Sequence, residues 1–96
     1  MQAENRTTRM EAILRATFAP TALEIVDDSA RHAGHAGATP GGETHFNVYI
    51  VSNYFTGLSR VARSRAVHTA LAAEFANGLH ALALTLRAPA EITVEK

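Results

Sequence analysis

The segment Thr-His-Phe-Asn-Val-Tyr-Ile-Val, residues 44–51, decides the fold, because it carries the clearest strand pattern in the 96-residue chain. Successive side chains of a β-strand point to opposite faces of the sheet. Phe46, Val48 and Ile50 fall on one face, which predicts that this side of the strand is buried. His45 and the other alternate residues fall on the second face, which we expect to be polar.

Downstream of this strand, the sequence predicts a turn, a helix and another strand. The turn covers residues 53–58, and Ser59 is a suitable N-cap for a helix that reaches about residue 76. Residues 77–78, Asn-Gly, tolerate left-handed geometry and end this helix. Residues 79–87 alternate as a strand with three leucines on one face. A helical connection normally makes the two strands parallel.

Upstream, the sequence predicts a flexible tail, a helix and a short strand. Residues 1–7 are expected to form the tail. Thr8 and Glu11 have the spacing of a capping box and open a helix over residues 8–18, which Pro20 stops. Residues 23–27 are typical of a short strand. Near the other end of the chain, Pro89 favours a short final helix.

Residues 28–43 are rich in Ala, Gly and His and have neither a helical nor a strand period, which predicts a long loop. Loops of this length are usually functional or disordered. The strands on either side of it can pair antiparallel. We therefore expect residues 8–96 to form one α+β domain, ordered helix-strand-strand-helix-strand. Its three-stranded mixed sheet is expected to be covered by helices on one face.

Composition limits the classes of function. The formal net charge is zero, which argues against a large electrostatic footprint for nucleic acid. The chain contains no cysteine, so it offers neither disulfides nor thiolate ligands. No apolar run approaches the roughly 20 residues that span a bilayer, and the first residues are polar. We expect a cytoplasmic protein that does not enter a membrane.

Histidines are the main chemical resource of the chain, because imidazole is the commonest protein metal ligand. His32 and His35 lie three residues apart in the predicted loop, a spacing that can serve one metal but does not enforce a site. His80 lies at the start of a strand, where it can reach a partner. The alternatives are a solvated loop and, for His80, a hydrogen bond to a backbone carbonyl. We expect His45 to be structural and His68 to lie on the surface.

Basic residues gather at the start of the predicted second helix, namely Arg60, Arg63 and Arg65. The positive end of the helix dipole favours anions there, so a phosphate or a protein partner is one interpretation. The alternative is a solvated helix start or a salt bridge to Glu24 or Asp27. No arrangement of nucleophile, base and acid typical of an enzyme is recognisable, and we expect no catalytic activity.

A series of motifs resembles the BolA-like protein family. The first half has Leu-Glu-Ile-Val-Asp-Asp-Ser at 23–29, His-Ala-Gly-His-Ala-Gly at 32–37 and Gly-Glu-Thr-His-Phe at 42–46. The second half has Phe-Thr-Gly-Leu-Ser at 55–59 and Gly-Leu-His-Ala-Leu at 78–82. The resemblance covers about residues 8–88 and implies a fold like that of the class II KH domain.

The resemblance also implies a partner and a cofactor. BolA-like proteins pair with monothiol glutaredoxins that carry a Cys-Gly-Phe-Ser motif, and the pair can hold a bridging [2Fe-2S] cluster in iron homeostasis or redox sensing. The glutaredoxin and glutathione supply thiolates, so no cluster is expected in the isolated chain. On the BolA-like side the family's signature histidine corresponds to His80. The loop ligand corresponds to His32, with His35 as the alternative.

Other functions remain open at this level. Relatives in the family are linked to transcription, so Arg60–Arg65 on a KH-like fold also predicts DNA binding. The family usually has Arg-His-Arg in the second helix, whereas this chain has Ser64 between the two arginines and lacks that histidine. A homodimer formed through the uncovered sheet face is a third interpretation.

Overall fold

The computed structural model describes residues 5–28 and 44–92. Along the chain, helix α1 (Arg6–Phe18) is followed by strands β1 (Ala22–Asp27) and β2 (His45–Val51), then by helices α2 (Arg60–Ala70) and α3 (Ala72–Ala76), and finally by strand β3 (Ala81–Arg87). Single 3-10 turns, η2 (Asn53–Phe55) and η3 (Pro89–Glu91), follow β2 and β3. The predicted element order is confirmed, except that the second helix is divided.

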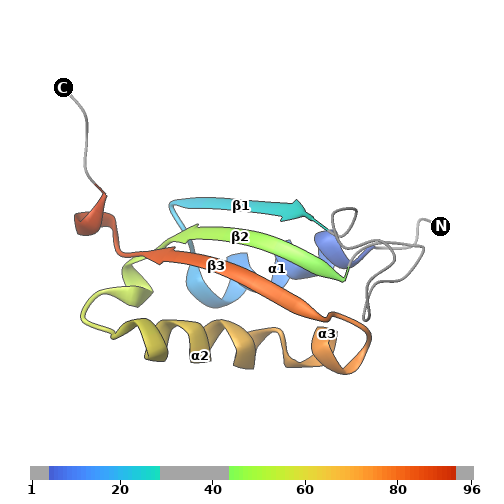
Figure 1. Ribbon diagram of the computed structural model, residues 1–96. Helices are drawn as coiled ribbons and strands as arrows, with labels where there is room; N and C mark the ends of the chain where they lie inside the picture. The colour runs from blue at the N-terminus through green and yellow to red at the C-terminus, as the bar shows by residue number, and fades with distance from the viewer. Residues whose placement is uncertain (1–4, 29–43, 93–96) are drawn as a thin grey trace.

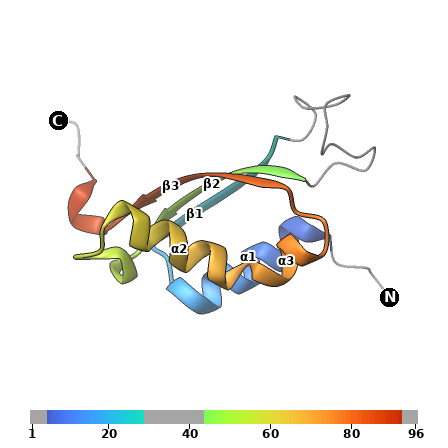
Figure 2. The ribbon, with the colours of Figure 1, turned by 60° about the horizontal axis from the view of Figure 1, so that its bottom comes forward.

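The three strands form one mixed sheet in the order β1-β2-β3. Strand β1 runs antiparallel to β2, with Ile25 opposite Val48, and β3 runs parallel to β2, with Leu84 opposite Val48. Both pairings are as predicted. The helices lie together on one face of the sheet, and the opposite face carries no helix among the described residues (Figures 1 and 2).

The core lies between the sheet and the helices. Phe46, Val48 and Ile50 of β2 are at most 2% exposed, so the face of this strand that was predicted to be buried is buried. They pack with the apolar stripe of α1, with one residue of α2 and with the residue that follows α2: Met10, Leu14, Phe18, Val67 and Leu71. Burying each large apolar side chain contributes about 1.5–3 kcal/mol. The core therefore fixes the register of β2 and, with it, the position of His45.

Helix α1 begins two residues before its predicted start. Asn5 is the N-cap and its Oδ1 accepts the backbone N–H of Thr8 at 2.8 Å. The predicted capping box at Thr8 is therefore wrong, and residues 5–7 do not belong to a tail. Arg6 is only 9% exposed, because its guanidinium is bonded to Glu74 at 3.0 Å. This contact across the fold holds the first turn of the helix.

The predicted second helix is interrupted at Leu71. Helix α2 starts as predicted, with Ser59 Oγ accepting the N–H of Ala62 at 3.1 Å. It ends where Leu71 adopts φ −101° and ψ 16°, and α3 follows in a new direction. The side chain of Leu71 is completely buried, and no Gly or Pro marks the break in the sequence. The break therefore coincides with core packing and not with a local stop signal. The new direction carries Glu74 to the two arginines at the start of α1.

Candidate metal and partner site

The backbone delivers His80 to an exposed corner between α3 and β3. Gly78 has φ +116°, a backbone conformation that favours glycine, and a Cβ there would lie only 3.0 Å from Nη2 of Arg6 and would press against that guanidinium. Leu79 then packs into the core at 4% exposure, and its N–H bonds to the carbonyl of Glu74 at 2.8 Å. His80 follows with its side chain exposed. The strand was predicted to begin at residue 79, but it begins at Ala81.

The main chain of His80 is bonded to the residue that directly precedes β2. The carbonyl of Thr44 accepts both the N–H of His80 at 2.8 Å and that of Ala81 at 3.0 Å. Thr44 itself is 2% exposed. An exposed imidazole on an anchored backbone loses little entropy when it binds a ligand, because only its side-chain torsions remain to be ordered. This is the geometry of an accessible metal ligand.

His45 lies against His80. Their ring centroids are 5.2 Å apart with an interplanar angle of 49°. Nδ1 of His45 is 2.9 Å from Oγ1 of Thr44, and His45 is 9% exposed. His45 is therefore a buried residue on the face of β2 that was expected to be polar, which fits the structural role expected for it. Thr44, His45 and His80 form what we call the histidine corner.

Both ends of the long predicted loop meet the histidine corner. The N–H of Asp28 bonds to the carbonyl of His45 at 2.7 Å, and Thr44 belongs to the corner itself. His32 and His35 lie in the segment between these ends, outside the described residues. His32 is four residues from Asp28, and four residues of chain reach at most about 14 Å. His35 is seven residues from Asp28, for which the same limit is about 25 Å, so chain length keeps both histidines within possible reach of the corner and does not select between them.

The described residues do not form a metal site by themselves. No group of three or more His, Cys, Asp or Glu side chains that could hold a metal occurs among residues 5–28 and 44–92. A metal at the histidine corner therefore needs ligands from the loop, from a partner or from both. An exposed single imidazole and a chain without cysteine fit a shared centre better than a self-contained one.

The predicted arginine patch is divided by the structure. Arg63 is 7% exposed and makes its bonds inside the molecule: Nε donates to the carbonyl of Leu58 at 2.9 Å, and both Nη atoms donate to the carboxylate of Glu91 at 2.7 Å. The predicted role of Arg63 in binding a phosphate or partner conflicts with this arrangement. The alternative interpretation, a salt bridge, is correct for Arg63, but its partner is Glu91 and neither Glu24 nor Asp27.

The Arg63–Glu91 pair has a clear electrostatic consequence. Hydrogen bonds from Arg63 and from the N–H of Ala88 lower the pKa of Glu91 to about 2. Glu91 in turn raises the pKa of Arg63. This pair joins α2 to η3, and Arg63 also donates to the carbonyl of Leu86 on β3 at 3.1 Å. Arg63 is therefore a structural cross-link.

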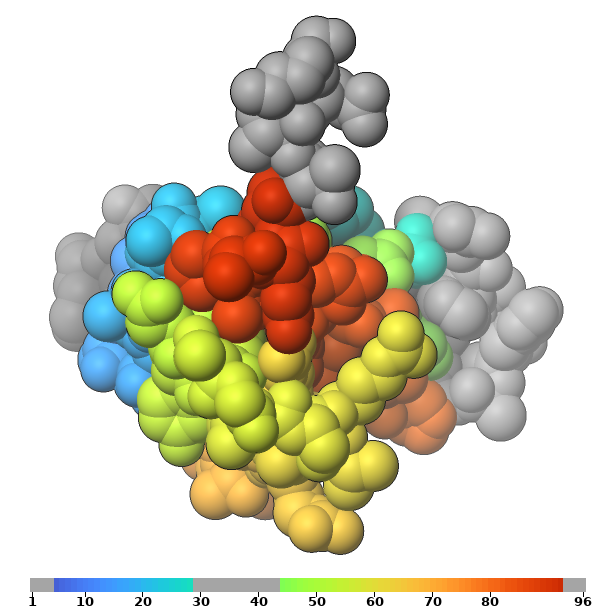
Figure 3. All heavy atoms as spheres, turned by 90° about the vertical axis from the view of Figure 1, so that its left-hand side faces the viewer, coloured from blue at the N-terminus to red at the C-terminus, as the bar shows by residue number. Residues whose placement is uncertain are grey.

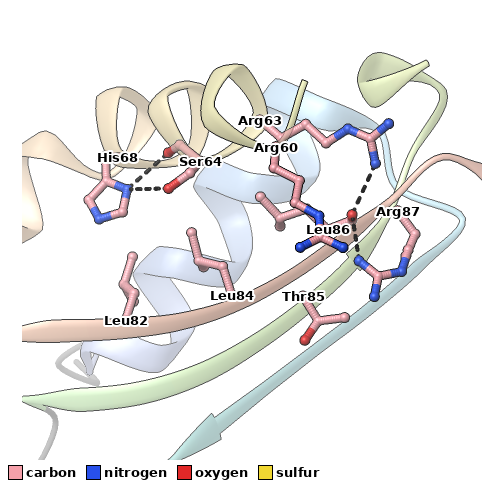
Figure 4. A pocket seen from close by; sticks show the side chains of 9 residues that line it. All are labelled: Arg60, Arg63, Ser64, His68, Leu82, Leu84, Thr85, Leu86 and Arg87. Carbon is pink, nitrogen blue, oxygen red and sulfur yellow. Dashed lines mark hydrogen bonds between the residues drawn. The ribbon is translucent and has the colours of Figure 1, made fainter. Parts of the chain in front are cut away.

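The other two arginines remain exposed. Arg60 lines an open hollow of about 400 Å³ between α2 and β3, together with Arg87, Ser64 and His68. Figure 4 shows leucine side chains of β3 below α2, with His68 and the arginines toward opposite ends of the hollow. Figure 3 shows the start of α2 beside the red C-terminal residues. Arg65 is outside this lining, so the two exposed arginines do not share one site.

The model of the family described as BolA-like protein matches residues 14–91, which is most of the chain. The chain belongs to the BolA-like family. The match includes all three strands and the complete histidine corner, and it confirms the resemblance predicted from the motifs.

Relatives and solved structures agree with this assignment. The chain is 46% identical over 90 residues to "Protein BOLA1, chloroplastic" of Arabidopsis thaliana, covering 92% of this chain and 56% of that protein. It is 46% identical to "DNA-binding transcriptional regulator BolA" of Escherichia coli, covering 79% and 69%. The solved BolA domain of SufE1 from Arabidopsis thaliana superposes with a TM-score of 0.84 at 41% identity, covering 95% of this chain and all of that one.

The BolA-like chain thus spans only about half the length of some curated relatives that it matches. No helix among the described residues is long and apolar enough to cross a membrane.

The sequence missed two features of the site, the ring contact of His45 with His80 and the internal bonds of Arg63. The first follows once β2 and β3 are paired in parallel, because the register sets His45 opposite Ala81.

Proposed function

We propose that this BolA-like chain is a non-enzymatic accessory protein that binds a monothiol glutaredoxin and shares a bridging [2Fe-2S] cluster with it. The observation that carries the proposal is the exposed imidazole of His80 on a backbone held by Thr44. The loop that holds His32 and His35 starts and ends beside it. A role in iron–sulfur or iron homeostasis, or in redox sensing, follows from such a shared centre.

The proposed ligand set divides between the two proteins. Iron–sulfur clusters depend mainly on thiolates, and this chain has none to offer. His80 and His32, or His35 in its place, would supply the nitrogen ligands, while the glutaredoxin and glutathione would supply the thiolates. Histidine in place of thiolate raises the reduction potential of a [2Fe-2S] centre. The chain's contribution is therefore to orient imidazoles and to tune the potential.

The proposal is tested by assembling the complex without oxygen from a Cys-Gly-Phe-Ser glutaredoxin, glutathione, iron and sulfide. The visible absorption and circular dichroism of the glutaredoxin centre are expected to change when this chain is added. His80→Ala should abolish the change, and comparison of His32→Ala with His35→Ala identifies the loop ligand.

The matched control is His68→Ala, because His68 is also an exposed histidine but lies on α2, outside the histidine corner. Its complex should have the wild-type spectrum. Size measurement with and without the glutaredoxin distinguishes a heterocomplex from a homodimer formed through the open sheet face. An unaltered spectrum for the His80→Ala, His32→Ala, His35→Ala triple variant would rule the proposal out.

DNA binding is the second candidate function. A relative that is 46% identical carries the name of a DNA-binding transcriptional regulator, and Arg60 and Arg65 are both exposed on α2. If both contact phosphates, the logarithm of affinity should fall with that of salt concentration with a slope near −2. Arg60→Gln should then make the slope less negative by about one. Binding that does not respond to salt would count against this candidate.

A further inference from the structure

Strand β3 is an edge strand, and its free side borders the hollow between α2 and β3. Among residues 5–28 and 44–92, the sheet order β1-β2-β3 leaves β3 with a partner strand on one side only. Exposed edges present unpaired N–H and C=O groups and are normally covered or blocked. In Figure 4 helix α2 lies beside β3, and the hollow lies between them.

The hydrogen bonds show which backbone groups point outward. The N–H of Ala81 bonds to Thr44 and the carbonyl of Arg87 accepts the N–H of Ser52, so these residues face β2. The backbone N–H and C=O groups of successive residues in a strand point to opposite sides. Those of Leu82, Leu84 and Leu86 therefore point to the free side of β3. The contacts of Leu86 support this orientation, because its carbonyl accepts hydrogen bonds from the side chains of Arg63 and Arg87 at 3.1 Å each.

Those arginines block the edge only at its C-terminal end. Within the described part of the chain, no hydrogen bond from another element reaches the outward groups of Leu82 or Leu84. Both leucines line the hollow, and Ser64 and His68 of α2 form its wall. A groove between an edge strand and a helix suits an extended polypeptide, which can pair with the strand while the helix contacts its side chains.

The charge at one end of the groove specifies the ligand further. Arg60, Arg63 and Arg87 surround a single described carboxylate, that of Glu91, so this end carries excess positive charge. Arg63 already satisfies Glu91, whereas Arg60 has no ion pair in the described residues. An acidic side chain would therefore be favoured beside Arg60.

We propose that the free edge of β3 binds an extended, acidic segment of a partner protein by strand addition. The backbone groups of Leu82 and Leu84 form hydrogen bonds with the backbone of that segment, and Arg60 forms an ion pair with one of its acidic side chains. Single-stranded nucleic acid is the weaker fit. No Phe, Tyr or Trp is among the described residues that line the hollow, and stacking rings usually bind unpaired bases. The proposal does not depend on glutaredoxin binding.

The test uses a capped peptide of about six residues with alternating valine and glutamate, a typical strand length. At about 1 mM peptide, the amide signals of Leu82 and Leu84 in the full chain should shift and exchange more slowly with deuterium. Two N-methylated versions separate strand pairing from charge. Methylation of the alternate amides that face β3 should abolish binding, and methylation of the other set should not.

Arg60→Glu and Arg65→Glu form the matched protein pair, because both reverse one exposed charge on α2 and only Arg60 lines the groove. The dissociation constant should rise about tenfold for Arg60→Glu and less than about twofold for Arg65→Glu. Unchanged signals of Leu82 and Leu84, equal effects of the two substitutions, or displacement of the peptide by a single-stranded oligonucleotide of higher affinity would each overturn the proposal.

Discussion

Ser52 is a completely buried hydroxyl that joins the end of β2 to the end of α1. Its Oγ donates to the carbonyl of Phe18 at 2.5 Å and accepts the N–H of Tyr54 at 3.0 Å. Ser52→Ala leaves both of those backbone groups without this partner. We expect the free energy of unfolding to fall by about 1–3 kcal/mol, measured by urea denaturation.

The control for Ser52 is Thr69→Ala, which removes an exposed hydroxyl from α2. Its unfolding free energy should stay within about 0.5 kcal/mol of the wild type. A Ser52→Ala variant as stable as this control would show that the two backbone groups find other partners.

At the scale of single residues, the sequence predicted the location of the charges but not their use. Arg60, Arg63 and Arg65 look alike in a sequence, and only Arg63 is buried. Its acid, Glu91, lies 28 residues further along the chain, beyond the reach of any local pattern. His80 was predicted as an exposed strand-start residue and is exposed, because the corner that holds it has a local signal in Gly78.

At the scale of elements, one carboxylate joins the start of α1 to α3. Glu74 bonds to Arg6 at 3.0 Å and to Arg9 at 2.8 Å, and its side chain is 6% exposed. Glu74→Gln leaves two guanidinium groups facing a neutral amide. Because removing one member of a buried ion pair is costly, we expect a loss of about 3 kcal/mol in the free energy of unfolding, measured with denaturant.

Glu11→Gln is the comparison for Glu74. It removes a pair with Arg15 of similar length, 2.9 Å, but the side chains of Glu11 and Arg15 are 47% and 55% exposed. Solvent screens such a pair, and the expected loss is at most about 0.5 kcal/mol. Similar losses for both variants would mean that burial does not strengthen the Glu74 contacts.

The elements predicted correctly are those with a strong local pattern. The alternation of apolar residues was sufficient to predict β2 and β3. The cap at Ser59 was sufficient to predict the start of α2. The break at Leu71 was missed because neither Gly nor Pro marks it. The start of α1 was misplaced because Asn5 and Thr8 are both good caps, and the contact of Arg6 with Glu74 favours the earlier start.

At the scale of the whole molecule, β3 connects two different chemical environments. The histidine corner lies at its N-terminal end, and the arginine-lined hollow lies toward its C-terminal end. The topology was predictable because short connections and helical crossovers allow few arrangements. The candidate site was only partly predictable, since its assembly depends on pairing between strands that are far apart in sequence.

The dependence of stability on acid should report the two arginine-bonded carboxylates, Glu74 and Glu91, together. Hydrogen bonding to arginine lowers the pKa of Glu74, and that of Glu91 falls to about 2. A lowered pKa in the folded state stabilises the protein above the ordinary carboxylate range, near 4.3, and this contribution is lost as pH falls further. The free energy of unfolding should therefore decline as pH falls from about 4.5 to about 2.

The slope of the unfolding free energy against pH is set by the difference in bound protons between the unfolded and folded states. Glu91→Gln should reduce this difference by about one proton, because the unfolded wild type takes up a proton at residue 91 that the folded form does not. Denaturant unfolding at a series of pH values measures the slope. Glu24→Gln is the matched control, since no guanidinium among the described residues bonds this exposed side chain on β1. Equal slopes for wild type and Glu91→Gln would show that the bond between Arg63 and Glu91 does not persist in solution.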